Sequence, residues 1–208
     1  IGVAEIHYWH GFDRLLKGLA NYYIHSPQYK VYFHIIGDFF SPREREEYMS
    51  IIKENHLAAY VILHGRQAGQ MLDLLFELCD FGIGSLGRHR SGITNIKTLK
   101  NREYAARGIP FIYSEIDEDF ENMPYIMKIP ANEEAVDIKQ ILNFYNQLHI
   151  TPLEIRNSIR HLSWNNQMKK VLDEMQKKDK INPNNNNIAN FATLYTNKFI
   201  PNKEKWPH

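Results

Sequence analysis

The sequence predicts an α/β fold: a doubly wound, parallel sheet of about six strands with helices on both sides. Short runs rich in β-branched and aromatic residues alternate with amphipathic or charged runs, which is the pattern of repeated βαβ units. The 208 residues suffice for one large domain. Hydrophobic residues make up 43% of the chain and charged residues 24%, as in globular proteins.

The expected strands are short apolar runs bounded by glycine, proline or polar residues. They lie at residues 1–9, 29–37, 59–64, 81–86, 110–114 and 125–130. The last two strands are separated by an acidic segment, residues 115–121, which we expect to be a solvated loop.

The expected helices lie between these strands and after the last one. Their ranges are residues 12–25, 42–56, 69–79, 98–107, 136–149 and 152–178. The first carries apolar residues at helical spacing from Phe12 to Tyr23. The second begins at Ser41-Pro42, a capping serine followed by a first-turn proline. The third is apolar on most faces, and the fourth ends at Gly108.

The end of the chain differs in composition from the rest. Residues 182–190 are Asn-rich, which is typical of a linker or loop. We therefore expect a domain at residues 1–178 and an Asn-rich linker and C-terminal tail at residues 179–208. Because Ile1 already opens an expected strand, we also expect the sequence to be a fragment of a longer protein.

Charge and cysteine content exclude several classes of protein. Lys plus Arg number 25 against 24 for Asp plus Glu, a net charge of +1, which argues against nucleic-acid binding through bulk charge. The single cysteine cannot form an internal disulfide, and no His or Cys pair has metal-ligand spacing. No run approaches the roughly 18 apolar residues that a transmembrane helix needs.

Ligands of open parallel sheets bind beyond the carboxyl ends of the strands, near a switch in strand order. The segments at those ends are Trp9-His10-Gly11, Gly37-Asp38, Gly65-Arg66, the loop after Leu86, and Ser114-Glu115. Glycine at most of these ends lets the backbone approach a ligand closely. His10 precedes a helix start, where it could donate to a phosphate or sugar oxygen or simply be a hydrogen-bonded core residue.

The fourth of these ends concentrates positive charge. No acidic residue lies between Asp80 and Glu103, a stretch that contains Arg88, His89, Arg90, Lys97, Lys100 and Arg102. Polar and flexible residues lead from there into a helix start near Thr98: Ser91, Gly92, Thr94 and Asn95. A helix N-terminus suits a phosphate, so the loop is either a pyrophosphate site or a solvated basic loop. Glu103 either accepts hydrogen bonds from ribose hydroxyls or forms an ion pair with Lys100 or Arg107.

The glycines of GIGSLG, Gly82, Gly84 and Gly87, match the dinucleotide fingerprint G-x-G-x-x-G. That motif must follow a strand and open a helix at once. Here the first two glycines lie within the expected strand, and no helical period follows. We therefore reject a dinucleotide site at this position.

Segments over residues 1–175 carry a family resemblance in order. They are WHGFDRLLKGL, YFHIIGD, AYVILHG followed by QMLDLLFELCDFGIGSL, TLKNREYAARGIPFI and IRHLSWNNQMKKVL. The most specific is TLKNREYAARGIPFI, with a glutamate, a small-residue face and Gly-x-Pro before a strand. The chain resembles the C-terminal, nucleotide-sugar-binding half of glycosyltransferases of the GT-B fold, similar to retaining family 4 (group 1). The resemblance implies a Rossmann-like domain that is one half of that fold.

In that family the glutamate of this helix binds the ribose hydroxyls of the donor nucleotide, and its counterpart here is Glu103. The family has another glutamate eight residues earlier that contacts the donor sugar, where this chain has Asn95. Asparagine can hydrogen-bond a hydroxyl but carries no negative charge. The family's arginine and lysine for the diphosphate have no plain counterpart. His10 stands near the lysine's place, and Arg14 or the Arg88–Arg90 cluster substitutes.

The resemblance implies a retaining, metal-independent, hexosyltransferase-like enzyme without a cofactor, which transfers a sugar from a nucleoside-diphosphate sugar to an acceptor. The residues expected to act in catalysis are Asn95, Arg88, Arg90 and Lys100. Those expected to bind the nucleotide and donor are His10, Gly11, Gly37, Gly65, Arg66, Ser91, Gly92, Thr94 and Glu103. An N-terminal acceptor domain, absent from this chain, would complete the cleft, so we expect the chain alone to be inactive.

Two alternatives stay open: a non-catalytic GT-B-like interaction module, which Asn95 favours, and a sugar-nucleotide epimerase of GT-B fold. The expected partners are the nucleotide sugar, the missing N-terminal domain, and an acceptor glycan or lipid-linked glycan, but not nucleic acid. We expect a cytoplasmic location, with peripheral attachment at the inner face of a membrane by analogy.

Overall fold

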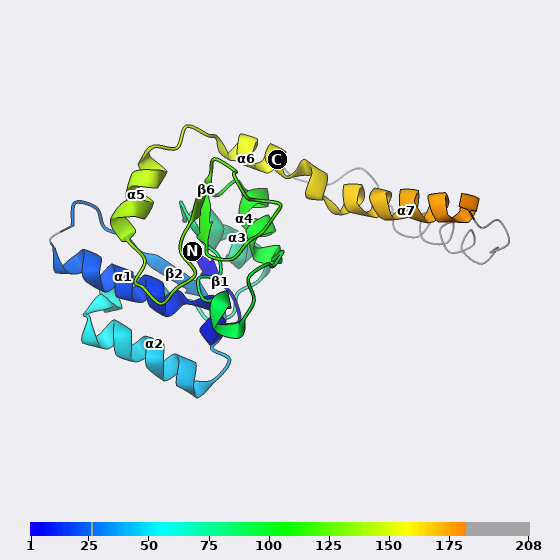
Figure 1. The fold of residues 1–208 in the computed structure, drawn as a ribbon. Helices are drawn as coiled ribbons and strands as arrows, with labels where there is room; N and C mark the ends of the chain where they lie inside the picture. Colours follow the sequence, from blue (N-terminus) through cyan, green and yellow to red (C-terminus); the bar gives the residue numbers. More distant parts are fainter. Residues whose placement is uncertain (26, 182–208) are drawn as a thin grey trace. The chain divides into compact units, whose positions relative to one another are not determined.

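The structure is a computed structural model that describes residues 1–25 and 27–181 (Figure 1). The chain divides into two compact units, Ile1–Ile159 and Arg160–His208. Most of the expected linker and tail, residues 182–208, lies outside the described residues.

The first unit is an α/β fold with parallel strands, which confirms the predicted fold class. Its strands are β1 (Gly2–Val3), β2 (Phe33–Ile36), β3 (Val61–Leu63), β4 (Gly82–Ile83), β5 (Phe111–Tyr113) and β6 (Ile126–Lys128). They pair as two three-stranded sheets, β1-β2-β3 and β4-β5-β6, and every pairing is parallel. The single sheet of about six strands that we expected is therefore corrected to two smaller sheets.

The break between the two sheets has a specific cause, the hydroxyl of Tyr104. The N–H of Ile83 donates to the carbonyl of Ile1 at 2.8 Å, as in a parallel ladder between β1 and β4. The next bond of that ladder would run from Val3 N–H to the Ile83 carbonyl. Instead, Val3 donates to the Tyr104 hydroxyl at 3.3 Å, and that hydroxyl donates to the Ile83 carbonyl at 2.9 Å. A side chain thus bridges the two strands.

Helices and 3-10 turns connect these strands. In the first unit they are η1 (Tyr8–His10), α1 (Phe12–Ile24), α2 (Pro42–Glu54), η2 (Leu57–Ala59), α3 (Gly69–Glu77), η3 (Arg88–Ser91), α4 (Leu99–Arg107), α5 (Ile138–Asn146) and α6 (Pro152–Ser158). The predicted caps are confirmed: Ser41 Oγ accepts the Glu44 N–H, and Gly108 adopts φ 76° after α4. Figure 1 shows α1 and α2 on one side of the strands and α3 and α4 on the other.

Most expected elements are shorter in the structure than predicted, and two of them differ most. The strand expected at residues 1–9 is regular only at β1, because the chain turns into η1 after an isolated bridge between Ile6 and Phe39. The helix expected at residues 152–178 is interrupted. The second unit begins with η4 (Arg160–Leu162), and α7 (Trp164–Ile181) starts anew after Ser163, whose Oγ accepts the Asn166 N–H at 3.4 Å.

The loop at residues 115–121 is not the solvated segment that its acidic residues suggested. Glu115, Asp117 and Phe120 are all buried. The Asp117 carboxylate accepts hydrogen bonds from Asn101 at 3.1 Å and from Arg102 at 3.2 Å. These partners on α4 compensate the burial of its charge, so the loop packs onto the helix.

The apolar interior has two parts. One part lies under α1, whose buried residues Phe12, Leu16 and Leu19 belong to a core cluster with Phe33 and Ile35 of β2. The other is a buried aromatic group around β5, made of Tyr104, Phe111, Tyr113, Phe120 and Tyr125. No helix among the described residues is both long and apolar enough to cross a membrane.

Replacing Tyr104 with phenylalanine is expected to lower the free energy of unfolding by about 1–3 kcal/mol, because a buried N–H and a buried carbonyl each lose a partner. Urea denaturation followed by circular dichroism measures the change. Tyr32→Phe is the control, since Tyr32 is 49% exposed, and it should change stability by less than about 0.5 kcal/mol. Equal stability of the two variants would contradict the bridging role of Tyr104.

Candidate functional site

The candidate site lies where the turn after β1 meets the loop after β4. The N–H of Leu86 donates to the carbonyl of His10 at 2.9 Å. A Cβ on Gly11, whose φ is +66°, would lie 2.6 Å from the backbone nitrogen of Gly87. Only glycine therefore permits this approach of the two backbones. The expected site residue Gly11 is thus required for the packing of two loops against each other.

Arg14 of α1 holds the loop after β4 together with the segment that follows β6. The side chain is only 2% exposed. Its guanidinium donates to the carbonyls of Leu86, Pro130 and Glu134 and to the side chain of Asn132. These bonds occupy the donors that a diphosphate would need, so Arg14 does not substitute for the missing basic pair.

Arg90 is also engaged by the protein itself. It donates to both carboxylate oxygens of Asp13 at 2.8 and 2.9 Å, to Glu133 at 2.6 Å and to the carbonyl of Tyr8 at 2.8 Å. Its hydrogen bonds lower the pKa of Glu133 to about 2. The geometry therefore makes Arg90 a clamp between η3 and α1, and leaves it without free donors for the catalytic role that we expected.

His10 is buried, and it lies in the turn before α1. Its Nδ1 accepts the N–H of His7 at 3.0 Å. Burial, together with the charges of Lys100 and Arg88, lowers the pKa of His10 to about 2. The neutral ring therefore carries its proton on Nε2, where it can donate to a ligand oxygen.

Three charged groups near His10 are buried without a partner. Among the described residues, no hydrogen bond is made by Arg88 Nε, Lys100 Nζ or either carboxylate oxygen of Glu115. Burial, and secondarily Arg88, lowers the pKa of Lys100 to about 7, although Glu115 opposes the shift. Burial raises the pKa of Glu115, although Lys100 and Arg88 oppose that shift. Unpaired buried charges are costly, so this cluster is where a polar ligand would be most stabilising.

The sequence placed Glu115 at the end of a strand but gave it no role. The sequence did contain a sign of a role for Glu115, because this residue directly follows β5 and so lies at the same edge of the sheet as the basic loop. Its isolation from solvent could not be read from the sequence, because the acidic segment mixes buried members such as Asp117 with exposed ones such as Glu118.

The remaining residues of the expected basic loop lie at the surface. Ser91, Thr94 and Asn95 are exposed. Ser91 Oγ donates to the carbonyl of Arg88 at 2.9 Å, and Gly92 adopts φ +70°. Asn95 forms an isolated parallel bridge with Ile116, which ties this segment to the chain that follows β5.

Glu103 forms an ion pair with Arg107. Its Oε1 accepts from Arg107 Nε at 3.2 Å and from Nη2 at 3.1 Å, and Arg107 also binds Asp73 at 2.7 Å. The structure therefore contains the ion pair with Arg107, which was one of the two interactions expected of Glu103. Oε2 takes no part in these bonds, and the Glu103 side chain is 41% exposed, so that oxygen stays open to a ligand.

The ends of β1, β2 and β3 surround a small cavity of about 350 Å³. It is lined by Val3, Ala4, Glu5, Ile36, Gly37, Asp38, Arg66 and Gln67. Gly37 has a packing role there, since a Cβ on it would overlap the carbonyl oxygen of Ala4. Gly65 has φ +62° and its carbonyl accepts the Gly37 N–H at 2.8 Å. Arg66 is exposed at the rim.

The GIGSLG glycines also have packing explanations. A Cβ on Gly82 would lie 2.8 Å from the ring of Tyr104, and one on Gly84 would lie 2.7 Å from the carbonyl oxygen of Ile112. Gly87 faces Gly11. The segment continues into η3, so it does not open an α-helix directly as a dinucleotide motif would.

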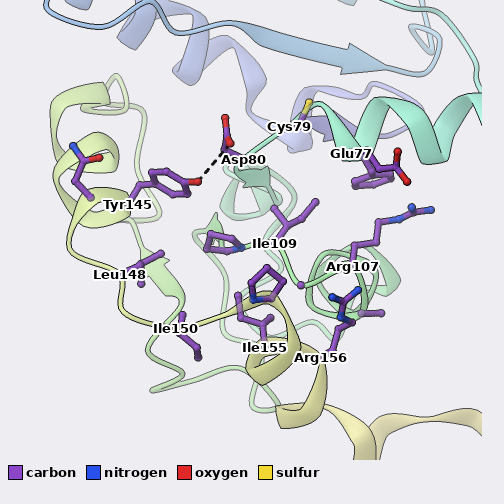
Figure 2. A pocket seen from close by; sticks show the side chains of 16 residues that line it. Glu77, Cys79, Asp80, Arg107, Ile109, Tyr145, Leu148, Ile150, Ile155 and Arg156 are labelled. Atoms are coloured by element: carbon purple, nitrogen blue, oxygen red, sulfur yellow. Dashed lines mark hydrogen bonds between the residues drawn. The ribbon is translucent and has the colours of Figure 1, made fainter. Parts of the chain in front are cut away.

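A larger cavity of about 700 Å³ lies at the opposite, amino ends of β4 and β5 (Figure 2). Asp80, just before β4, accepts a hydrogen bond from the Tyr145 hydroxyl at 3.5 Å across it. Arg107 and Arg156 line it on one side, and its apolar lining includes Ile109 and Ile155 (Figure 2). The sequence contains no sign of this cavity, because its lining comes from three stretches that lie far apart in the chain, residues 76–80, 106–110 and 145–156.

No group of three or more His, Cys, Asp or Glu side chains in the described part of the chain is arranged to hold a metal ion.

Arg90→Met is expected to lower the free energy of unfolding by about 3 kcal/mol or more, because it leaves the buried Asp13 carboxylate with only Lys17 as a charged partner. Chemical denaturation measures the loss. Arg88→Met is the matched control and should cost less than about 1 kcal/mol, since Arg88 forms no ion pair in the described structure. A similar loss in both variants would refute the distinction between the two arginines.

The double variant Lys100→Met, Glu115→Leu is expected to be as stable as the wild type, or more stable by up to about 4 kcal/mol, because apolar side chains replace two buried, unpaired charges. Thermal and urea denaturation test this. Each single variant should be less stable than the double variant, because it leaves one charge without its neighbour. A double variant less stable than both single variants would mean that the pair supports the fold.

Comparisons with known proteins place the fold. No family model matches the chain, and no curated protein matches it. Among solved structures, a glycosyltransferase from Rickettsia africae matches with TM-score 0.65 and 18% identity over 85% of this chain and 46% of that one. HepE from Anabaena, solved in complex with UDP, matches with TM-score 0.60 and 17% identity over 83% of this chain and 48% of that one.

A third solved structure is a separate C-terminal domain. It belongs to a group 1 glycosyltransferase, LpcC, from Francisella tularensis, and matches with TM-score 0.52 and 14% identity over 76% of this chain and 81% of that one. The chain thus spans slightly less than half of the two longer structures and most of the separate domain. At these identities the likeness concerns the fold, and the chain has the Rossmann-like fold of one half of the GT-B glycosyltransferases.

Proposed function

We propose that the chain is the donor-binding domain of a retaining glycosyltransferase that transfers a sugar from a nucleoside-diphosphate sugar to an acceptor. The observation that carries the proposal is the cluster of Arg88, Lys100 and His10 at the meeting of the two loops. Two of these groups are cations with an unpaired buried nitrogen, and the third is a neutral donor. An anion with several oxygens is the ligand that satisfies all three.

The position of the cluster also supports a diphosphate. It lies beyond β1 and β4, the neighbouring edge strands of the two sheets, from which the strand order runs in opposite directions. Such switch points are the usual ligand sites of open α/β sheets. Helix α4 begins nearby at Leu99, with Thr98 as its cap. The N-terminus of a helix carries a partial positive charge, which favours a bound anion. The complex of HepE with UDP is a further support, because that protein shares the fold.

In this proposal Arg88 and Lys100 stabilise the negative charge that develops on the leaving diphosphate, so no metal ion is required. Burial lowers the pKa of Lys100 to about 7, and a bound diphosphate would favour the protonated form. Glu103 would contact ribose through Oε2. Asn95, exposed near α4, remains the candidate for a donor-sugar contact, and Arg90 serves by fixing η3.

Catalysis would need an acceptor-binding half, since the fold of this chain corresponds to only part of the longer matched structures. An acceptor glycan, free or lipid-linked, would bind between the halves. The chain alone is expected to bind nucleotide without turnover. The neutral Asn95 favours one other candidate, a non-catalytic module of the same fold that binds nucleotide but transfers no sugar even in the full-length protein.

Calorimetric titration of the 208-residue chain with UDP, GDP and ADP tests the proposal. At least one is expected to bind saturably with a dissociation constant below about 1 mM, equivalent to about −4 kcal/mol. Glu103→Gln should weaken that binding by about tenfold to a hundredfold, as expected for the loss of a charged hydrogen-bond acceptor. The exposed Glu118→Gln is the control and should leave the affinity unchanged.

Absence of saturable binding for all three nucleotides would contradict the proposed function. Binding that is unaffected by Glu103→Gln would leave the diphosphate site in place and restrict Glu103 to its ion pair with Arg107.

A further inference from the structure

The Glu115 carboxylate is the acidic member of the unpaired cluster in the candidate site. Its side chain belongs to a residue that is 2% exposed, and neither oxygen has a hydrogen-bond partner among the described residues. A carboxylate buried in this way gives up its hydration and receives no bond in return. The proposed diphosphate site does not use this group, so it needs a separate explanation.

The charged groups that act on Glu115 come from two elements. Lys100 on α4 and Arg88 on η3 both favour its ionised form, without forming a hydrogen bond to it. Lys128 on β6 lies nearby but bonds elsewhere: it donates to the main-chain carbonyl of Glu115 and to the carboxylate of Glu121. The backbone N–H groups of Glu115 and Ser114 also favour the ionised form, but neither reaches a carboxylate oxygen with the geometry of a hydrogen bond. The described chain thus offers the carboxylate nearby positive charge and no well-formed hydrogen bond.

The two cations and the carboxylate make different demands on a ligand. Arg88 and Lys100 would be stabilised by negatively charged oxygens of a ligand, whereas the Glu115 carboxylate would be stabilised by hydrogen-bond donors of a ligand. A free diphosphate meets the first demand only, and it places further negative charge near the carboxylate. A diphosphate ester that carries hydroxyl groups meets both demands at once.

We propose that Glu115 accepts hydrogen bonds from hydroxyl groups of the sugar attached to the diphosphate, and so distinguishes a sugar nucleotide from the free nucleotide. This inference rests on the proposed function and adds a specificity residue to it. The two other candidates for hydroxyl contacts differ in kind. Asn95 is neutral and exposed, and Glu103 already accepts two bonds from Arg107.

The test compares free and sugar-carrying nucleotides by calorimetry on the whole chain, using UDP with UDP-glucose, GDP with GDP-mannose and ADP with ADP-glucose. The quantity measured is the ratio of the two dissociation constants within a pair that binds. In Glu115→Gln this ratio should shift by about tenfold or more against the sugar nucleotide, the scale of one hydrogen bond to a charged group. In the control Glu118→Gln, at an exposed site in the same segment, it should shift less than about twofold.

The outcomes separate the two proposals. An unchanged ratio in Glu115→Gln, with the free nucleotide still binding, would overturn the role of Glu115 and leave the proposed function intact. Failure of the wild type to bind any free nucleotide would overturn the proposed function itself. Should Glu115→Gln not fold, Glu115→Asp keeps the charge but shortens the side chain, and it should shift the ratio in the same direction.

Discussion

The close approach of two backbones, at Gly11 and Gly87, is the constraint on which the candidate site depends. Any side chain at Gly11 would overlap the Leu86–Gly87 backbone. The bond from Leu86 N–H to the His10 carbonyl then fixes the loop after β4 against the turn after β1. Because of this contact, a histidine from one loop and an arginine from the other reach the same place, although 78 positions separate His10 from Arg88 in the chain.

The arginines of this region differ in the partners that the protein provides for them. Arg14 satisfies backbone carbonyls, and Arg90 neutralises Asp13 and Glu133. Both hold loops that otherwise have little regular structure. Arg88, in contrast, keeps a buried Nε without a hydrogen-bond partner among the described residues. Arg14, Arg88 and Arg90 thus carry the same guanidinium group and differ only in the hydrogen-bond partners that the fold places around them.

The difference between local patterns and contacts of residues far apart in the chain explains which features could be predicted from the sequence. The alternation of strands and helices, the Ser41 cap and the end of α4 at Gly108 are local patterns, and the structure has them. The break in the sheet depends on the Tyr104 hydroxyl, which meets β1 across about a hundred residues of sequence. The sequence could not separate Arg90 from Arg88 for the same reason, since Asp13 and Glu133 lie far from both along the chain.

Unpaired buried charge is the strongest physical sign of function in this molecule. Asp117 shows that the fold can pair a buried carboxylate, because Asn101 and Arg102 bond to it. Glu115, two residues earlier, receives no such bond. This contrast between two neighbouring carboxylates is the basis of our proposal that Glu115 contacts a ligand from outside the chain. The same reasoning applies to Lys100, which shares the cluster and lacks a partner for its Nζ.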